Sequence, residues 1–539
     1  MVTAGRRILA DGHGPDQTGG VTDTATTPAP GQATPTASRG HAAFAGVAAA
    51  AMALGLGELI AAFVAARSAP LVAVGGLIID KVPESGKELA IRLFGTYDKV
   101  ALQVGTVIVL AAIAAVLGVL AARRLWIGLA GIAVFGAVGV ASSVSRVGAD
   151  ASWALPSLLG AVAAGVVLWL VLRLAAKASG DAYTDSSERT RRQFLASAGI
   201  VLGGAAVVGY AGRQFAQNSA VNGARESLAF PTPIGTRAVA PPQADVASLS
   251  YVTSNESFYR IDTALVVPRI DPSDWSLTIG GRVGNPMRLS FADLLKRPMI
   301  ERYVTLACVS NEVGGDLIGN AKWLGVPLKD LLEEAQPDPA ADQVVSRSVD
   351  GFTAGTPTKA LLDGRDAMIA VAMNGEPLPI DHGFPARMVV PGLYGYVSAT
   401  KWLSSLELTT FADFDAYWIP RGWAQQAPIK TSSRIDRPRA GGSVPVGQFV
   451  VAGVAWAQHR GISKVEVRVD GGPWQEATLA ATASIDTWRL WSWTWDATPG
   501  DHTLAVRAYD NAGEVQDELQ RPPAPDGATG YHEISVSVG

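Results

Sequence analysis

A single cysteine, Cys308, stands in the segment Leu306–Asn311 of the 539-residue chain. The segment follows a β-like run at residues 302–305 and precedes a glycine-rich turn at Gly314–Asp316. A lone cysteine cannot form an internal disulfide, so it serves packing, redox chemistry or metal ligation. Packing is the ordinary role, because free cysteines are among the most buried residues in proteins. The motifs found elsewhere in the chain decide between these roles.

Composition separates the chain into two unlike parts. Hydrophobic residues make up 48% of the whole and charged residues 17%, and residues 1–212 are rich in Ala, Val, Leu and Gly. Residues 213–539 have the composition of a soluble protein with many tryptophans. A chain of this length predicts two or three domains. The net charge of -4, without a patch of Lys and Arg interleaved with aromatics, predicts no nucleic-acid partner.

The first part carries a predicted α-helical membrane domain over residues 41–180. Residues 1–40 are rich in Gly, Thr, Pro and Ala, which predicts a disordered cytoplasmic tail. An apolar segment at 70–80, bounded by Pro70 and Pro83, is too short to span and predicts an interfacial or re-entrant piece. The apolar runs of about 20 residues, long enough to cross a bilayer as helices, are 44–66, 100–122, 125–144 and 153–175.

Residues 188–212 predict an export signal joined to a fifth span. The sequence Thr190–Leu195 contains the pair Arg191–Arg192 before an apolar run that extends to Ala211. This order resembles a twin-arginine export signal, an address read by machinery that carries folded proteins. The alternative is ordinary positive charge flanking a membrane span. We expect the apolar run to remain as an anchor, with a cofactor taken up before export.

Basic residues in the loops predict a topology. They gather between spans two and three and between spans four and five, and cytoplasmic loops are enriched in Lys and Arg. With five spans, the N-terminus is cytoplasmic, and everything after residue 212 lies on the extracytoplasmic face of a multi-pass cell-membrane protein. The basic residues concerned are Arg123, Arg124, Arg173, Lys177, Arg191 and Arg192.

The predicted spans contain few residues that could do chemistry. None of the six histidines lies in a span, so we expect no bis-histidine haem in this chain. Glu58 does lie inside the first span. A carboxylate within a membrane is a functional hypothesis by default, and the alternative is a position near the outer end of the helix that meets water or a neighbouring helix.

The extracytoplasmic part predicts two folded domains after a linker. Residues 213–250 contain Pro, Ala and Gln in an irregular order that is typical of a linker. Residues 251–430 alternate short strand-like and helix-like runs, which predicts a mixed α+β domain. Residues 431–539 contain short strands at regular spacing, with a hairpin turn at Asp470–Pro473, which predicts an all-β immunoglobulin-like sandwich.

Four sequence motifs stand out in this part of the chain. They are Asn255–Arg260, Thr305–Asn311 continued by Ala321–Leu328, Met373–Arg387 continued to Gly395 and Trp402, and Asp486–Trp491. On these motifs, residues 251–539 resemble the sulfite oxidase family of molybdenum enzymes, in which a molybdopterin-binding domain precedes an immunoglobulin-like domain. The resemblance covers more than half of the chain, and its third motif is long and specific.

The resemblance implies a molybdenum–molybdopterin cofactor with Cys308 as the protein ligand of the metal. The planar guanidinium of Arg387 and the compact charge of Lys401 both suit the binding of the pterin phosphate. His382 could donate a hydrogen bond to the cofactor. Taken alone, each has a plainer interpretation: a surface ion pair, a solvated strand end and a loop histidine, respectively. The cofactor-binding residues implied are Asn255, Phe258, Tyr259, Asp350, His382, Arg387, Gly395, Ser398 and Lys401.

The resemblance also implies two-electron oxygen-atom transfer on a small sulfur or nitrogen oxo-compound, with Arg260, Tyr417 and Arg421 as catalytic residues. Electrons would pass to or from a separate carrier, either a c-type cytochrome or a quinone-linked membrane protein. The sandwich of this family often mediates dimerisation, which predicts a homodimer by analogy. One alternative is a reductase of methionine sulfoxide or other S- and N-oxides. Another is a non-catalytic cell-envelope scaffold that retains the fold.

The chain departs from sulfite oxidases at three places. Glu312–Val313 stand where that family has two arginines, and Ile261–Asp262 stand where it has Asn-His. The stretch Trp418–Trp423 replaces the segment that carries the family's active-site tyrosine, with Tyr417 just upstream. A carboxylate beside a dianionic substrate is unfavourable. The substrate therefore stays open between sulfite and other small oxo-compounds.

Overall fold

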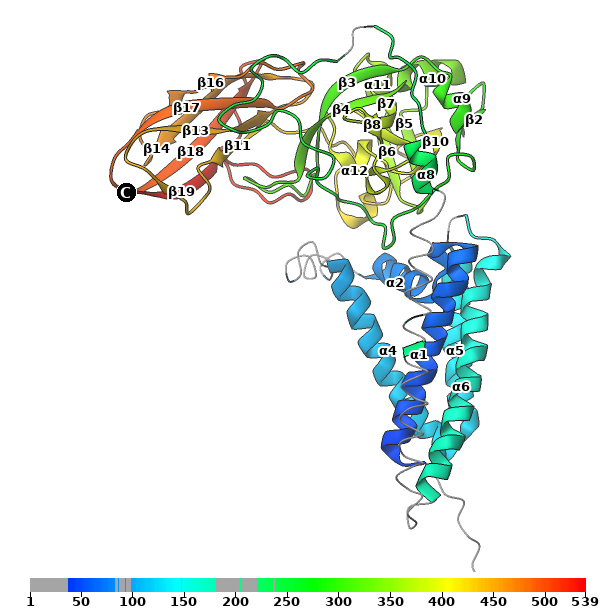
Figure 1. Cartoon of the computed structure of the whole chain (residues 1–539). Coiled ribbons are helices and arrows are strands. Elements are labelled where there is room, and N and C mark those ends of the chain that lie inside the picture. Colours follow the sequence, from blue (N-terminus) through cyan, green and yellow to red (C-terminus); the bar gives the residue numbers. More distant parts are fainter. Residues whose placement is uncertain are drawn as a thin grey trace, which may run out of the picture.

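A computed structural model describes residues 37–82, 98–146, 148–180, 221–235 and 238–539, with isolated residues between some of these ranges. Most of the predicted disordered tail lies outside the described residues, as does the predicted twin-arginine signal with nearly all of the fifth span. Figure 1 shows a helical bundle and two globular parts beyond one end of it. These are apolar helices, a mixed α/β domain and a β sandwich, so the predicted fold class is confirmed.

Among the described residues, four helices are long and apolar enough to cross a membrane by length and composition. They coincide with the four apolar runs in the sequence. Gly46 and Gly118 let the first two of them approach closely, because a Cβ on Gly46 would lie 1.9 Å from the carbonyl oxygen of Ala114. The four are α1 (Arg39–Val64), α4 (Asp98–Arg123), α5 (Leu125–Val144) and α6 (Leu155–Gly180).

The short apolar segment at 70–80 forms the 12-residue helix α2 (Pro70–Lys81). Pro70 stands in its first turn, where the missing N–H would have no helical partner. The 3-10 turn η1 (Ala66–Ser68) precedes α2, and a second one, η3 (Ala151–Ala154), precedes α6. In Figure 1 α2 lies at the end of the bundle nearest the globular parts. The connections at this end of the bundle therefore face the globular parts of the chain.

Two sheets build the middle domain, with the strand orders β2-β1-β10-β5-β6 and β3-β4-β7-β8, and with β9 paired to β7. β1 and β10 run parallel, and the other pairs are antiparallel. The strands are β1 (Ser276–Gly281), β2 (Met287–Ser290), β3 (Ile300–Ala307), β4 (Ile318–Pro327), β5 (Gln343–Ser348), β6 (Thr353–Pro357), β7 (Met368–Met373), β8 (Glu376–Pro377), β9 (Arg387–Val389) and β10 (Leu403–Thr409). The helices and 3-10 turns are α8 (Val221–Glu226), α9 (Phe291–Leu295), α10 (Leu328–Ala335), α11 (Thr358–Leu362), η4 (Ile380–His382), α12 (Gly395–Ser398) and η5 (Ile419–Arg421).

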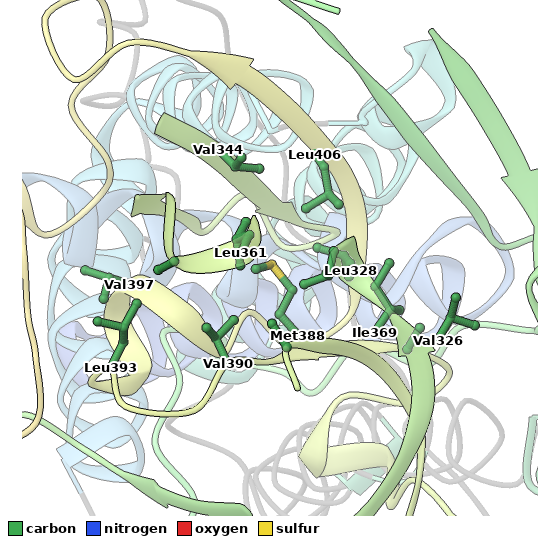
Figure 2. Close-up of a cluster of buried hydrophobic side chains, with 14 of the residues drawn as sticks. Val326, Leu328, Val344, Leu361, Ile369, Met388, Val390, Leu393, Val397 and Leu406 are labelled. Atoms are coloured by element: carbon green, nitrogen blue, oxygen red, sulfur yellow. The ribbon is translucent and has the colours of Figure 1, made fainter. Parts of the chain in front are cut away.

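Apolar side chains from both sheets and from α10 form the core of this domain, part of which is drawn in Figure 2. β7 is buried at every position, as expected for a strand covered on both faces. The helix α10 buries Leu328, Leu331 and Leu332 along one face and exposes charged residues on the other. Burying each of these leucines stabilises the fold by about 1.5–3 kcal/mol. The strands whose ends form the site are therefore attached to a rigid core.

Two further sheets pack face to face in the last domain, with the orders β11-β13-β17-β16 and β12-β19-β18-β14-β15. Trp491 and Trp495 of β17 are buried in the core between them, whereas Trp493 is only partly buried. The strands are β11 (Ser432–Arg437), β12 (Ser443–Val444), β13 (Gly447–Trp456), β14 (Ile462–Val469), β15 (Gln475–Glu476), β16 (Thr478–Leu479), β17 (Arg489–Ala497), β18 (Gly500–Asp510) and β19 (His532–Val538).

The loop before β17 joins the sandwich to the middle domain. The indole Nε1 of Trp488 donates to the carbonyl oxygen of Tyr251 at 2.9 Å, and its ring packs in the core of the middle domain. The backbone N–H of Trp488 donates to Oγ1 of Thr305 at 2.7 Å, and the N–H of Thr305 donates to the carbonyl oxygen of Asp486 at 3.0 Å. The sandwich therefore holds strand β3 just before Cys308. A homodimer through the sandwich stays a prediction.

Candidate functional site

Cys308 comes directly after β3 and begins a loop that returns to β4. Its N–H donates to the carbonyl oxygen of Leu317 at 2.9 Å, and its own carbonyl accepts from the N–H of Asn311 at 3.1 Å. The side-chain oxygen of Asn311 accepts from the N–H of Leu317 at 2.8 Å and closes the loop. Cys308 is unpaired, 9% exposed, and borders a cavity. The loop thus presents one thiol at a fixed position.

The cavity beside Cys308, here called the thiol cavity, has a volume of about 130 Å³. Its walls come from segments that lie far apart in the sequence, so the tertiary fold assembles it. Two basic side chains border it together with the thiol. The residues of its wall that the sequence predicted for the site are Phe258, Tyr259, Cys308, Asp350, Arg387, Gly395 and Lys401.

The protonation state of the Cys308 thiol depends on the groups beside it. Burial raises the pKa of Cys308, whereas hydrogen bonds from Ser310 and the charge of Lys401 lower it. A metal ion at the thiol would displace its proton, since coordinating thiols are deprotonated. No group of three or more His, Cys, Asp or Glu side chains in the described part of the chain could hold a metal ion. A metal bound at Cys308 would therefore take its other ligands from a bound organic group, as the predicted molybdopterin would supply.

His382 stands in the turn η4 and is buried. Its Nε2 faces the carbonyl oxygen of Asn255 at 3.2 Å, which makes Nε2 the protonated nitrogen. Burial and the charges of Lys401 and Arg387 lower the pKa of His382 to about 4, so its ring is neutral near pH 7. Nδ1 is buried and has no hydrogen-bond partner among the residues that the structure describes. His382 is not among the residues that line the thiol cavity, so its contact with a cofactor stays a prediction.

Arg387 is 3% exposed, so it is not the surface ion pair of the plainer interpretation. Its guanidinium donates to three backbone carbonyl oxygens, of His382 at 3.0 Å, Ala399 at 3.3 Å and Met388 at 3.4 Å. The group also lies 5.1 Å from the ring centroid of Trp323. Burial lowers the pKa of Arg387 to about 10, which leaves it charged at neutral pH. These contacts fix a buried cation on the wall of the thiol cavity.

Lys401 is likewise buried, and a carboxylate balances its charge. Its Nζ donates to Oδ2 of Asp262 at 3.2 Å and to the carbonyl oxygen of Asp381 at 3.0 Å. Burial lowers the pKa of Lys401 to about 8, and the charge of Asp262 opposes this shift. The carboxylate of Asp262 also accepts from Nε of Arg260 at 2.9 Å. The predicted catalytic Arg260 is not among the residues that line the thiol cavity, and it reaches that cavity only through Asp262.

Asn255 and Ser398 hold the wall of the cavity in place instead of lining it. The side-chain oxygen of Asn255 accepts from Nδ2 of Asn374 at 2.9 Å, and its Nδ2 donates to the carbonyl oxygen of Met373 at 3.3 Å. The hydroxyl of Ser398 donates to the carbonyl oxygen of Tyr394 at 2.9 Å. Asn255 thereby joins two distant segments of the chain, whereas Ser398 stabilises the turn that carries Gly395.

Tyr417 and Arg421 line a second cavity, of about 320 Å³, which adjoins the thiol cavity. The two cavities share Thr263, Asp350 and Phe352 in their walls. The guanidinium of Arg421 lies 3.8 Å from the ring centroid of Tyr417 and donates to the carbonyl oxygen of the same residue. Two of the three predicted catalytic residues therefore lie next to the thiol cavity and not on its wall.

Five aromatic side chains that the sequence did not assign to the site line the thiol cavity. The rings of Trp418 and Trp423 meet edge to face at 6.2 Å, and Tyr396 lies 5.8 Å from Trp423. Trp402 has a φ of 50°, which is rare for a bulky residue and typical of constrained functional segments. In the sequence, the only indication of this aromatic wall was the pair Trp418 and Trp423 on either side of the turn-forming segment Pro420–Gly422. The five are Phe352, Tyr396, Trp402, Trp418 and Trp423.

Comparison with family models gives matches in both globular domains. Residues 264–418 match the oxidoreductase molybdopterin binding domain, and residues 432–506 match the bacterial Ig domain. The first range contains Cys308, Arg387 and Lys401, and the second lies within the sandwich. The matched ranges thus contain Cys308 and both basic wall residues, whereas Phe258, Tyr259 and Trp423 lie outside them, and they contain most of the sandwich strands.

Curated relatives extend this similarity across the two domains. The mitochondrial sulfite oxidase of Rattus norvegicus is 30% identical over 334 residues, which cover 52% of this chain and 60% of that enzyme. The sulfite oxidase of Arabidopsis thaliana is 30% identical over 338 residues, which cover 52% of this chain and 85% of that enzyme. The solved structure of the sulfane dehydrogenase SoxCD from Paracoccus pantotrophus aligns with 54% of this chain and 82% of that chain, at 24% identity and a TM-score of 0.46. The match spans less than two thirds of the rat enzyme.

Proposed function

The chain belongs to the sulfite oxidase family of molybdopterin-dependent oxidoreductases, and we propose that it is a membrane-anchored, extracytoplasmic member of that family. The proposed reaction is two-electron oxygen-atom transfer on a small sulfur or nitrogen oxo-compound. One observation carries the proposal: the buried thiol of Cys308 and the buried cations of Arg387 and Lys401 border a single cavity. A thiolate suits a soft metal, and fixed cations suit an anionic pterin phosphate.

The family implies a molybdenum–molybdopterin cofactor, and the residues present fit one. Cys308 would ligate the metal, and the loop closed by Asn311 keeps that thiol in place. Of the residues predicted to contact the pterin, Phe258, Tyr259 and Gly395 also border the cavity, whereas His382 does not. Arg387 and Lys401 would balance the negative charge of the phosphate end. When bound, the metal centre supplies the two-electron redox chemistry.

The charges of the helical bundle support membrane anchoring with the proposed orientation. Arg123 and Arg124 follow the end of α4, and Arg173 lies in the last part of α6. The C-terminal ends of α4 and α6 lie at the end of the bundle away from the globular parts (Figure 1). Cytoplasmic loops are enriched in Lys and Arg, so this end would be cytoplasmic and the catalytic domain would be outside.

A reductase of sulfoxides or N-oxides is a second candidate, favoured by the aromatic wall of the thiol cavity. Phe352, Trp418 and Trp423 offer apolar surface to an organic substituent. Arg387 and Lys401 already bond to internal partners. A sulfoxide such as oxidised methionine carries no net charge at its oxygen and would need no further cation. In either direction, electrons would pass to or from a separate carrier, such as a c-type cytochrome or a quinone-linked membrane protein.

Cys308→Ser tests the proposal directly. We expect the detergent-purified wild type to contain molybdenum near one atom per chain, together with a pterin that becomes fluorescent after oxidation. Cys308→Ser should retain the pterin and the fold but lose turnover, because the metal loses its protein ligand. Assays of sulfite oxidation and of sulfoxide reduction then separate the two candidates. Turnover equal to that of the wild type in Cys308→Ser, or a wild type free of metal and pterin, would rule the proposal out.

A further inference from the structure

The second cavity lies where the helical bundle meets the catalytic domain. Its volume of about 320 Å³ makes it the larger of the two cavities near the site. The bundle contributes Arg67, Gly76 and Arg146 to its wall, and the catalytic domain contributes Asp350 and Arg421. Because its wall comes from both parts of the chain, neither part would form it alone.

Arginine dominates the charge of this cavity. Arg67, Arg146 and Arg421 are its basic wall residues, and Asp350 is the one carboxylate among the described residues of the wall. Burial lowers the pKa of Arg67, while the charge of Asp350 opposes that shift and the charge of Arg146 adds to it. The cavity therefore carries an excess of positive charge in a partly buried place.

Arg67 and Arg421 are anchored in the same way. Each donates to one backbone carbonyl oxygen, of Val349 and of Tyr417 respectively. Each guanidinium also lies over an aromatic ring, at 5.4 Å from the centroid of Trp153 for Arg67 and at 3.8 Å from that of Tyr417 for Arg421. A guanidinium has five N–H donors, so this anchoring holds its plane and leaves donors for a ligand.

Arg67 and Arg146 also stand at an unexpected end of the bundle. They lie at the end that meets the catalytic domain, opposite Arg123 and Arg124 (Figure 1). Under the proposed topology this end is extracytoplasmic, where Lys and Arg are depleted. Partial burial of a cation also costs free energy unless a negative charge compensates it. An anionic ligand in the cavity would supply that charge.

We propose that the second cavity is an oxyanion-binding antechamber, through which a small sulfate-like substrate or product exchanges with the thiol cavity. The two spaces share Thr263, Asp350 and Phe352 in their walls, so they adjoin each other at these residues. Glu312–Val313 replace the arginines that the sulfite oxidase resemblance would put beside the cysteine, and the antechamber arginines take over the attraction of the anion. This inference rests on the proposed function and narrows its substrate to an oxyanion.

Sulfate is the probe for the test. The full chain in phosphatidylcholine nanodiscs is heated with sodium sulfate, and with sodium chloride at equal ionic strength, and the difference in unfolding midpoint is measured. We expect sulfate to raise the midpoint of the wild type. Arg421→Gln and Arg67→Gln should each weaken the apparent sulfate affinity by about tenfold, as expected for one charge-assisted hydrogen-bonding group. The matched control is Arg437→Gln, whose guanidinium also bonds one carbonyl and lies 5.2 Å from a ring centroid, but in the sandwich.

The KM for sulfite, measured beside molybdenum and pterin content, separates this inference from the proposed function. Arg67→Gln should raise KM with kcat and cofactor content unchanged, and Arg421→Gln should raise KM with cofactor content unchanged. If Arg67→Gln disturbs the contact between the bundle and the catalytic domain, Arg421→Gln still tests the inference.

Equal stabilisation by sulfate in the wild type and in Arg421→Gln overturns the proposal of an oxyanion-binding antechamber. Loss of the sulfate effect in nanodiscs that contain phosphatidylglycerol would assign the cavity to a lipid phosphate and overturn the substrate route. Arginine-dependent sulfate binding in a protein without molybdenum would keep the anion site and reject the proposed function.

Discussion

Asp262 holds two cations of the site at once. Its carboxylate accepts from Lys401 at 3.2 Å and from Arg260 at 2.9 Å, and its side chain is 6% exposed. A buried charge is tolerated when it is paired and hydrogen-bonded. Lys401 in turn lowers the pKa of the Cys308 thiol. Asp262 therefore acts on the thiol through Lys401, which makes it a positioning residue that stands where sulfite oxidases have a histidine.

Asp262→Asn should lower the unfolding midpoint, because the buried Lys401 loses its counter-charge. Breaking a buried pair in this way costs about 3–5 kcal/mol. The matched control is Glu333→Gln, which removes an exposed pair with Lys329 at 3.8 Å and should cost less than about 1 kcal/mol. Differential scanning calorimetry of the full chain compares the two. Equal midpoints would contradict a structural role for the buried pair.

His532 gives the sandwich a pH-dependent contact with the loop after Cys308. Its Nδ1 accepts from the N–H of Ile435 at 3.0 Å, and its ring packs against Gly314, where a Cβ would lie 2.4 Å from it. Burial and the charge of Arg434 lower the pKa of His532 to about 4, against 6.5 without these effects. The unfolded chain therefore binds more protons between these two pH values. The contribution that neutral His532 makes to the free energy of unfolding is complete above pH 6.5 and is lost as the pH falls toward 4.

We expect the unfolding midpoint to fall between pH 7 and pH 5, by the equivalent of about 1 kcal/mol for a group that is partly screened by solvent. His532→Asn keeps an acceptor near the position of Nδ1 but does not titrate. That variant should lose this part of the pH dependence. A pH profile identical to that of the wild type would exclude His532 as its source.

At the scale of elements, strand β3 links the sandwich to the thiol. The loop before β17 bonds to Thr305 through the backbones of Asp486 and Trp488, and Trp488 fills a place in the core of the middle domain. Trp488→Ala should therefore cost about 3–5 kcal/mol and lower the unfolding midpoint of both domains together. Trp493→Ala, in the same strand region but only partly buried, should cost less. Equal losses in calorimetry would argue against Trp488 as the junction.

Local sequence patterns predict the individual elements of this molecule but not how those elements pack against one another. A lone cysteine after a strand-like run and apolar runs of span length are local features, so the thiol and four helices were predictable. Tyr396 and Trp423 lie side by side only in the folded chain, and nothing near Arg67 in the sequence indicates its bond to Val349. The positive φ of Trp402 is likewise imposed by tertiary contacts and not by residue type.

At the scale of the whole molecule, the helical bundle contributes directly to the surroundings of the site. It forms part of the wall of the antechamber, and Arg67 bonds to the segment that carries Asp350. The sandwich, in contrast, supports the strand that carries the thiol (Figure 1). The site is therefore held by three parts of one chain. Under the proposed membrane anchoring, the orientation of the bundle would decide from which side an anion enters.

The orientation can be mapped because Cys308 is the only cysteine, so Cys308→Ser provides a cysteine-free background. Val446 is 55% exposed in the sandwich, and a Cβ added to Gly40, at the start of α1, would meet no atom within 4 Å. A membrane-impermeant maleimide should label Val446→Cys on intact spheroplasts and Gly40→Cys only after permeabilisation, since the basic ends of α4 and α6 would stay in the cytoplasm. Replacing Arg191 and Arg192 by lysine should abolish the labelling of Val446→Cys, because a twin-arginine address would be lost. Labelling of Gly40→Cys on intact cells would reverse the topology and place the antechamber on the cytoplasmic side.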